Sequence, residues 1–90
     1  MHIDITPPPD DLMACFGSLD AALAADAAGE KARRLATYFG QAEMETRQWQ
    51  LRTTDFEQRR VAACLADALA ASKRVVAAAW TKKHGRELAI

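Results

Sequence analysis

The most constraining feature of this chain is a repeat of apolar residues at intervals of three and four, interrupted once near the middle. One run extends from Leu12 to Leu51, and a second extends from Val61 to Trp80. Residues 52–55 separate the two runs. Because residues three and four apart lie on one face of an α-helix, the pattern predicts amphipathic helices on both sides of the interruption.

Local signals predict where the second helix begins and ends. Thr54 and Glu57 have the spacing of a capping box, in which each side chain accepts a backbone N–H at a helix N-terminus. Lys82, Lys83 and His84 place positive charge at the expected C-terminal end, and Gly85 follows them. These signals predict a single long helix of about thirty residues, or about 45 Å.

The beginning of the first arm is harder to define. Pro7-Pro8-Pro9 fixes φ and removes amide donors, so residues 1–9 are predicted to form a flexible tail and residues 10–90 a single domain. Gly17, Gly29 and Gly40 each weaken a helix, which makes them the expected points where the first arm bends or breaks.

The expected fold is therefore all-α. Two long helical arms form an antiparallel helical hairpin behind an extended N-terminal tail, with Gly17, Gly29 or Gly40 as the expected break point of the first arm. No segment alternates apolar and polar residues with a period of two, so no strand is predicted.

Charge and hydropathy exclude several classes of partner. The 12 basic and 12 acidic residues cancel, so net charge attracts neither nucleic acid nor an anionic membrane. No run approaches the roughly twenty apolar residues of a membrane span. The sequence Met1-His2-Ile3-Asp4 lacks the basic start of a secretion signal. A cytoplasmic location is expected.

Residue types that carry chemistry are scarce. Cys15 and Cys64 have no metal-ligand spacing around them and are predicted to be reduced, small apolar fillers. His2 and His84 have no nucleophile nearby in sequence. We therefore expect no enzyme activity, cofactor or metal. Two alternatives stay open, a chorismate-mutase-like enzyme using arginines of the first arm and a nucleic-acid binder using basic pairs such as Arg59-Arg60.

The second arm has more apolar surface than one neighbouring helix can cover. One row of residues runs from Val61 to Ala79, and a second row beside it runs from Leu65 to Trp80. In a two-helix hairpin only one row can pack against the first arm. The other row is left for a second contact, which predicts binding of a partner protein or self-association into a four-helix bundle.

The second arm, read with its turn, resembles the small co-chaperones of type III secretion systems, the YscE/SsaE/EscE-type family. The residues that carry the resemblance are Asp55-Phe56-Glu57-Gln58 after the turn, then Ala68-Leu69, Val75-Val76 and Trp80 in an apolar stripe. The sequence differs from that family in its longer N-terminal region, its Gly40 and its Trp49.

The resemblance implies a cytoplasmic hairpin that docks on a helical-repeat chaperone, the two together keeping a needle subunit soluble. It implies no chemistry by the hairpin itself. The expected partner-interface or seam residues are Phe56, Val61, Leu65, Leu69, Val76 and Trp80.

Overall fold

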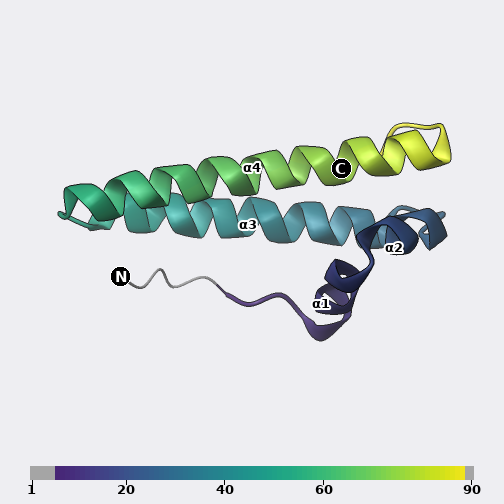
Figure 1. Ribbon diagram of the computed structural model, residues 1–90, viewed down its shortest axis with the longest axis horizontal. Coiled ribbons are helices and arrows are strands. Elements are labelled where there is room, and N and C mark those ends of the chain that lie inside the picture. Colours follow the sequence, from purple (N-terminus) through teal and green to yellow (C-terminus); the bar gives the residue numbers. More distant parts are fainter. Residues whose placement is uncertain (1–5, 89–90) are drawn as a thin grey trace.

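The computed structural model describes residues 6–88, and these residues form four α-helices with no strand among them. Helix α1 spans Asp10–Gly17 and α2 spans Leu19–Ala25. Helix α3 spans Glu30–Arg52 and α4 spans Phe56–His84. The predicted all-α class is confirmed (Figure 1).

Helices α3 and α4 lie side by side along most of their length and run in opposite directions (Figure 1). Their length sets the long dimension of a molecule that measures 45 × 24 × 17 Å. Residues 53–55 connect them. The helix cap differs from the predicted capping box: Asp55, not Thr54, is the N-cap of α4, and its carboxylate accepts the Gln58 N–H at 3.0 Å. A carboxylate is favoured there because it also faces the positive end of the helix dipole.

The first arm is broken at Gly17 and Gly29, two of the three glycines expected to interrupt it, and the chain changes direction twice before α3. Gly17 ends α1, and Gly29 precedes α3 with a φ of 76°, which glycine adopts without strain. Gly40, by contrast, lies inside a continuous α3 and does not break it. Tertiary packing along the whole of α3 compensates for the low helix propensity of one glycine.

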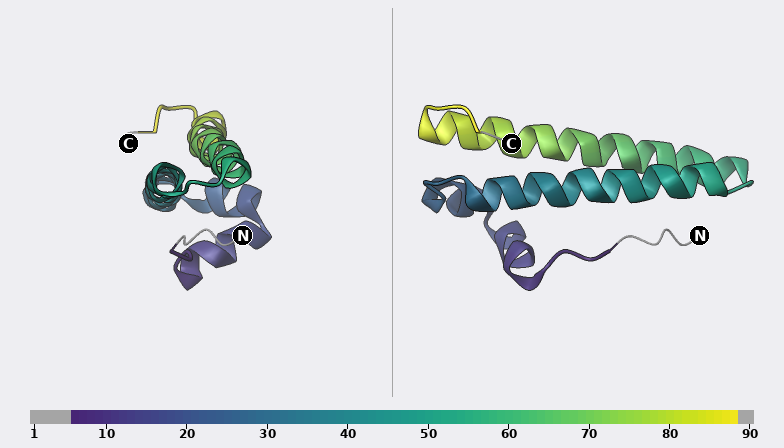
Figure 2. Two further views of the ribbon diagram at one scale, coloured as in Figure 1. Left: turned by 90° about the vertical axis from the view of Figure 1, so that its left-hand side faces the viewer. Right: turned by 180° about the vertical axis from the view of Figure 1, so that it is seen from behind.

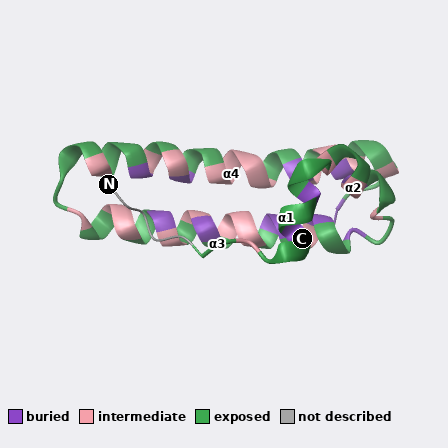
Figure 3. Cartoon of the chain, turned by 60° about the horizontal axis from the view of Figure 1, so that its bottom comes forward, coloured by how far each residue is buried: buried purple, intermediate pink, exposed green. Residues whose placement is uncertain are grey.

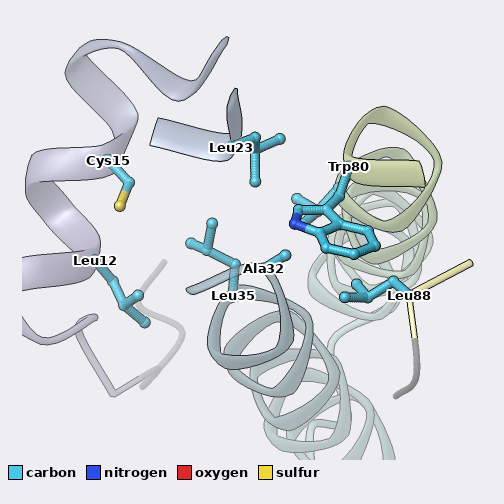
Figure 4. Close-up of a cluster of buried hydrophobic side chains, with 8 residues drawn as sticks. Leu12, Cys15, Leu23, Ala32, Leu35, Trp80 and Leu88 are labelled. Atoms are coloured by element: carbon cyan, nitrogen blue, oxygen red, sulfur yellow. The ribbon is translucent and has the colours of Figure 1, made fainter. Parts of the chain in front are cut away.

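The two short helices fold back against one end of the α3–α4 pair (Figure 2). Asp11 of α1 pairs with Arg34 of α3, and Asp20 of α2 pairs with Lys83 of α4. A hydrophobic cluster lies between these elements (Figure 4). Its buried members are Leu12, Cys15, Leu23, Ala32, Leu35, Val76, Trp80 and Leu88.

Away from this cluster, small residues form the contact line between α3 and α4. Ala42 and Thr46 of α3 and Ala62 and Ala66 of α4 are all at most 2% exposed. The buried positions follow the facing sides of the two helices toward the turn (Figure 3). Alanines allow the helices to approach closely but bury little apolar area, so the large side chains of the core gather at one end of the molecule.

The predicted tail is only partly within the described residues, since residues 1–5 lie outside them, as do residues 89–90 of the predicted domain. Thr6 lies against α3, where its main-chain N–H donates to the Glu45 carboxylate at 3.1 Å. The Tyr38 hydroxyl donates to the Thr6 carbonyl oxygen at 3.0 Å. These bonds direct the chain along α3 before α1 begins.

Candidate protein-interaction surface

Large apolar side chains are exposed on three separate parts of the molecule, and these are the candidate interaction surfaces. The most exposed group lies near the connection between α3 and α4, a second lies along α4, and a third lies on α1. The exposed residues are Met13, Phe16, Met44, Leu51, Phe56, Val61 and Val75. Large apolar side chains left exposed on a small domain are candidate contacts for another protein.

The turn patch consists of Met44, Leu51 and Phe56, and its last two members are the most exposed large apolar side chains in the described residues. Leu51 is 82% exposed and Phe56 is 75% exposed. Leu51 lies in the last turn of α3, and Phe56 is the first residue of α4 because Asp55 caps the helix there. The cap therefore fixes an aromatic side chain in water at the end of the molecule.

The connection beneath the turn patch is held by several side-chain hydrogen bonds. The Thr53 hydroxyl donates to the Gln58 side-chain oxygen at 2.9 Å. The Arg59 Nε donates to the Thr53 carbonyl oxygen at 2.9 Å. These bonds link the end of α3 to the first turn of α4, so the turn patch is presented on an ordered connection.

The outer stripe of α4 is a row of residues at alternating intervals of four and three along the exposed side of the helix. Glu57 and Lys82 are its two charged ends, and every residue between them is uncharged. Seven of its eight members are exposed, Ala71 being half-buried. The outer stripe is Glu57, Val61, Cys64, Ala68, Ala71, Val75, Ala78 and Lys82.

An apolar hollow of about 270 Å³ opens beside the outer stripe, where α1 and α2 meet α3 and α4. Phe16 of α1 and Phe39 of α3 form one wall, with ring centroids 6.1 Å apart. Ser72, Val75 and neighbouring residues of α4 form the other wall. The hollow has the size and lining to accept one or two apolar side chains from outside the chain.

A larger hollow of about 480 Å³ lies between the chain before α1 and the outer side of α3, and its lining is mixed. Arg34 donates a hydrogen bond to Asp11 at its edge, which holds the pKa of the Asp11 carboxyl below its ordinary value. Burial, with a further contribution from the Glu45 charge, raises the pKa of the Tyr38 hydroxyl. Thr6 bridges this hollow through Tyr38 and Glu45.

The interface or seam residues predicted from the sequence do not gather on one surface. Val76 and Trp80 are buried in the core, at 3% and 1% exposure. Leu65 and Leu69 are half-buried. Phe56 and Val61 are the two exposed residues of the six, at 75% and 42% exposure.

Trp80 is held in the core by polar contacts that the sequence pattern does not reveal. Its indole N–H donates to the Asp26 carbonyl oxygen at 2.7 Å. The His84 ring packs 4.5 Å from the indole, and the Arg86 guanidinium lies 4.9 Å from the ring centroid. Trp80 therefore serves the fold of this chain.

Two exposed residues, Leu51 and Val75, were not among the six interface or seam residues predicted from the sequence. Leu51 appeared there only as the last member of the first apolar run, and Val75 only within the apolar stripe of the second arm. Cys64 also differs from its predicted role, because it is exposed, whereas Cys15 is buried as expected. Both thiols are free in the structure.

Within residues 6–88, no three His, Cys, Asp or Glu side chains are grouped so that they could hold a metal ion. Among the four helices described, none is both long and apolar enough to cross a membrane.

Comparison with known proteins supplies a family. A family model described as type III secretion system regulatory protein HrpD6 matches residues 4–82 of the 90 residues. The match covers all three exposed apolar surfaces. Neither the curated proteins nor the solved structures contain a match.

Proposed function

We propose that this chain, which belongs to the HrpD6 family of type III secretion system regulatory proteins, is a non-enzymatic co-chaperone of that secretion system. In this proposal it acts in the bacterial cytoplasm as a helical hairpin. It docks on a helical partner protein and helps to keep a needle subunit soluble before export. The family supports the link to type III secretion, and the resemblance of the second arm to YscE-type co-chaperones supports the finer role.

The observation that carries the proposal is the exposure of the turn patch. Phe56 and Leu51 are each more than 70% exposed. The transfer of their apolar surface from water to a partner's surface has a favourable free energy. Burying a whole side chain of this size contributes roughly 1.5–3 kcal/mol. Phe56 and Leu51 are therefore large apolar side chains that a partner can desolvate fully, and full desolvation is a property of binding hot spots.

The proposed partner surface is a hydrophobic groove on a helical protein. The connection between α3 and α4 lies at the end of the helical pair away from α1 and α2 (Figure 1), so a concave groove can receive the turn patch without contacting those two helices. Arg52 and Arg59 lie beside the patch in sequence and can face acidic residues at the rim of such a groove. The helical-repeat chaperones implied by the sequence resemblance have concave surfaces of this kind.

The test is co-expression of the chain with the needle subunit and a helical-repeat chaperone of the same secretion system. We expect the three proteins to elute together in gel filtration, and the needle subunit to remain in the supernatant after ultracentrifugation. The variant Leu51→Asp/Phe56→Asp should lose both results. Gln48→Asp, an exposed change on α3, is the matched control and should retain them.

Three results would contradict parts of the proposal. If the needle subunit sediments to the same extent with and without this chain, the co-chaperone role is wrong. A chain that elutes only with itself supports the alternative expected from the sequence, a self-associating helical bundle. If Gln48→Asp and the turn-patch variant behave alike, the turn patch is not the binding surface.

A further inference from the structure

We infer that the outer stripe of α4 is a homodimer interface, on which a second copy of this chain packs its own α4 in the antiparallel direction. The inference concerns a surface distinct from the turn patch and goes beyond the proposed co-chaperone role. It rests on the spacing of the stripe, on the signs of its end charges and on the apolar hollow beside it.

The spacing of the stripe is that of a helix–helix contact. Its members recur at alternating intervals of four and three over the exposed side of α4, which is the spacing that keeps one line of residues facing a neighbouring helix. Helix α3 covers a different line, that of Ala62, Ala66, Val76 and Trp80. Among the described residues, no other helix of the chain covers Val61, Ala68 or Ala78, which are exposed.

The end charges identify the occupant as a second copy. Glu57 closes the stripe at the N-terminal end and Lys82 closes it at the C-terminal end, so an antiparallel copy sets opposite charges against each other at both ends. A parallel copy would set like charges against each other. In such a contact Glu57 of each copy faces Lys82 of the other, which is the isologous pairing of a two-fold dimer.

A single antiparallel register pairs every residue of the outer stripe with another residue of the stripe on the second copy. With Glu57 opposite Lys82 of the second copy, the two-fold axis passes between Leu69 and Ala70 in sequence. The same register sets Val61 opposite Ala78, Cys64 opposite Val75 and Ala68 opposite Ala71. Each pair joins a position preceded by an interval of four to one preceded by an interval of three, as antiparallel coiled-coil packing requires. The small residues at the centre allow close approach of the two helices.

The apolar hollow supports the same arrangement. Ser72, Val75 and Val76 line it, and the residues opposite them in this register lie around Leu65 of the second copy. Leu65 lies at the edge of the stripe nearest the α3 side and is half-buried in the single chain. In the dimer it can enter the hollow beside Phe16 and Phe39, which gives the alanine-rich stripe additional apolar contact on both sides of the two-fold axis.

The first test measures the mass of the full chain by analytical ultracentrifugation from low micromolar to millimolar concentration. We expect a monomer–dimer equilibrium. Glu57→Lys and Lys82→Glu should each set like charges together at both ends and weaken dimerisation at least about tenfold. The double variant Glu57→Lys/Lys82→Glu should restore it. Lys31→Glu on α3 makes the same change in net charge as Lys82→Glu and should leave the dimer unchanged.

The second test fixes the register. In Val75→Cys the introduced thiol faces Cys64 of the second copy, so mild oxidation should give a covalent dimer on a non-reducing gel. Gln48→Cys, an exposed change on α3 outside both proposed surfaces, should give far less of it. Circular dichroism of each variant checks that the helices remain.

Three results would overturn the inference. The first is a monomer at every concentration. The second is a dimer whose dissociation constant is the same in Glu57→Lys and Lys82→Glu as in the unaltered chain. The third is a double variant as weak as either single one although it is fully helical. Each result can be obtained without a secretion partner, so none depends on the proposed function.

Discussion

Trp80 and Asp26 lie far apart in the sequence, yet the indole N–H of Trp80 donates to the main-chain carbonyl oxygen of Asp26 at 2.7 Å. The Asp26 carboxylate in turn accepts the Ala32 N–H at 2.9 Å. One residue between α2 and α3 therefore connects the end of α4 to the beginning of α3. The connection fixes the position of the two short helices relative to the long pair.

Trp80→Phe tests this connection. The substitution keeps most of the buried ring but leaves the Asp26 carbonyl oxygen without its donor, so we expect the free energy of unfolding to fall by about 1–3 kcal/mol. Trp80→Ala should cost more, about 3–5 kcal/mol, because it also leaves a cavity. Urea denaturation followed by circular dichroism at 222 nm measures both. Equal stability of Trp80→Phe and the unaltered chain would contradict the importance of the bond.

The cap of α4 gives a second prediction. Asp55→Ala should lower the free energy of unfolding by about 1 kcal/mol, since the Gln58 N–H loses its acceptor and the helix dipole loses a favourable charge. Thr54→Ala should cost less than about 0.5 kcal/mol, as expected for a surface position. Denaturant titration of the two variants separates the observed cap from the capping box that the sequence suggested. The reverse order of the two losses would restore Thr54 as the cap.

The third prediction is that alanine substitution lowers the stability at Gly29 and raises it at Gly40. A Cβ at Gly29 would lie 2.7 Å from Leu88 Cδ1 and 3.2 Å from Trp80 Cζ2, on a backbone whose φ is 76°. Gly29→Ala should therefore destabilise by at least about 1–2 kcal/mol. A Cβ at Gly40 would lie 3.7 Å from Lys73 Nζ, an ordinary contact, so Gly40→Ala should stabilise by about 0.5–1 kcal/mol.

Thermal melts compare these two variants with the unaltered chain at one protein concentration, because self-association would otherwise shift the midpoint. Gly85→Ala is a useful third variant. Its φ is 66°, but no atom lies within 4 Å of the new Cβ, so only backbone strain should count. A Gly40→Ala variant that melts at a lower temperature would show that α3 needs its glycine.

The pairing of Asp11 with Arg34 predicts an acid-sensitive position for α1. The hydrogen bond from Arg34 lowers the pKa of the Asp11 carboxyl, so the folded state favours the ionised form. The resulting stabilisation is present above the ordinary pKa of 3.8 and is lost as pH falls below it through the folded value. The effect is small, because both side chains are about half exposed to solvent and salt screens the pair.

Asp11→Asn isolates that contribution. Unfolding measured between pH 5 and pH 3 at low salt should show a steeper loss of stability in the unaltered chain than in Asp11→Asn. Asp10→Asn changes the neighbouring carboxyl and should leave the steeper loss in place. Identical pH profiles for the unaltered chain and Asp11→Asn would mean that the pair does not hold α1 against α3.

Local signals in the sequence predicted the long helices well. Gly85 ends α4 with a positive φ, and Lys82, Lys83 and His84 occupy its last turn, because helix ends depend on a few adjacent residues. The apolar spacing identified α3 and α4 as helices because residues three and four apart lie on one face of a helix. Confusion of Thr54 with Asp55 as the cap was a difference of one residue between two good cap formers.

The tertiary arrangement was less predictable. Ala62 and Ala66 are fully buried between α3 and α4, whereas Val61 and Val75 are exposed, although a ranking by side-chain size suggests the opposite. The direction in which α1 and α2 turn back depends on contacts between residues distant in sequence, such as Arg34 with Asp11. No local pattern contains that information, so the buried position of Trp80 beneath the α2–α3 connection could not be derived.

The concentration of large side chains at one end of the α3–α4 pair makes the stability of the molecule uneven. Backbone amides of α4 near Trp80 can exchange with deuterium only when the whole core opens, while amides near Phe56 are covered by contacts among small residues. Exchange should therefore slow progressively from the turn toward the C-terminal end of α4. The end that carries the turn patch is the end that opens first, and a bound partner would be detected as a gain of protection there.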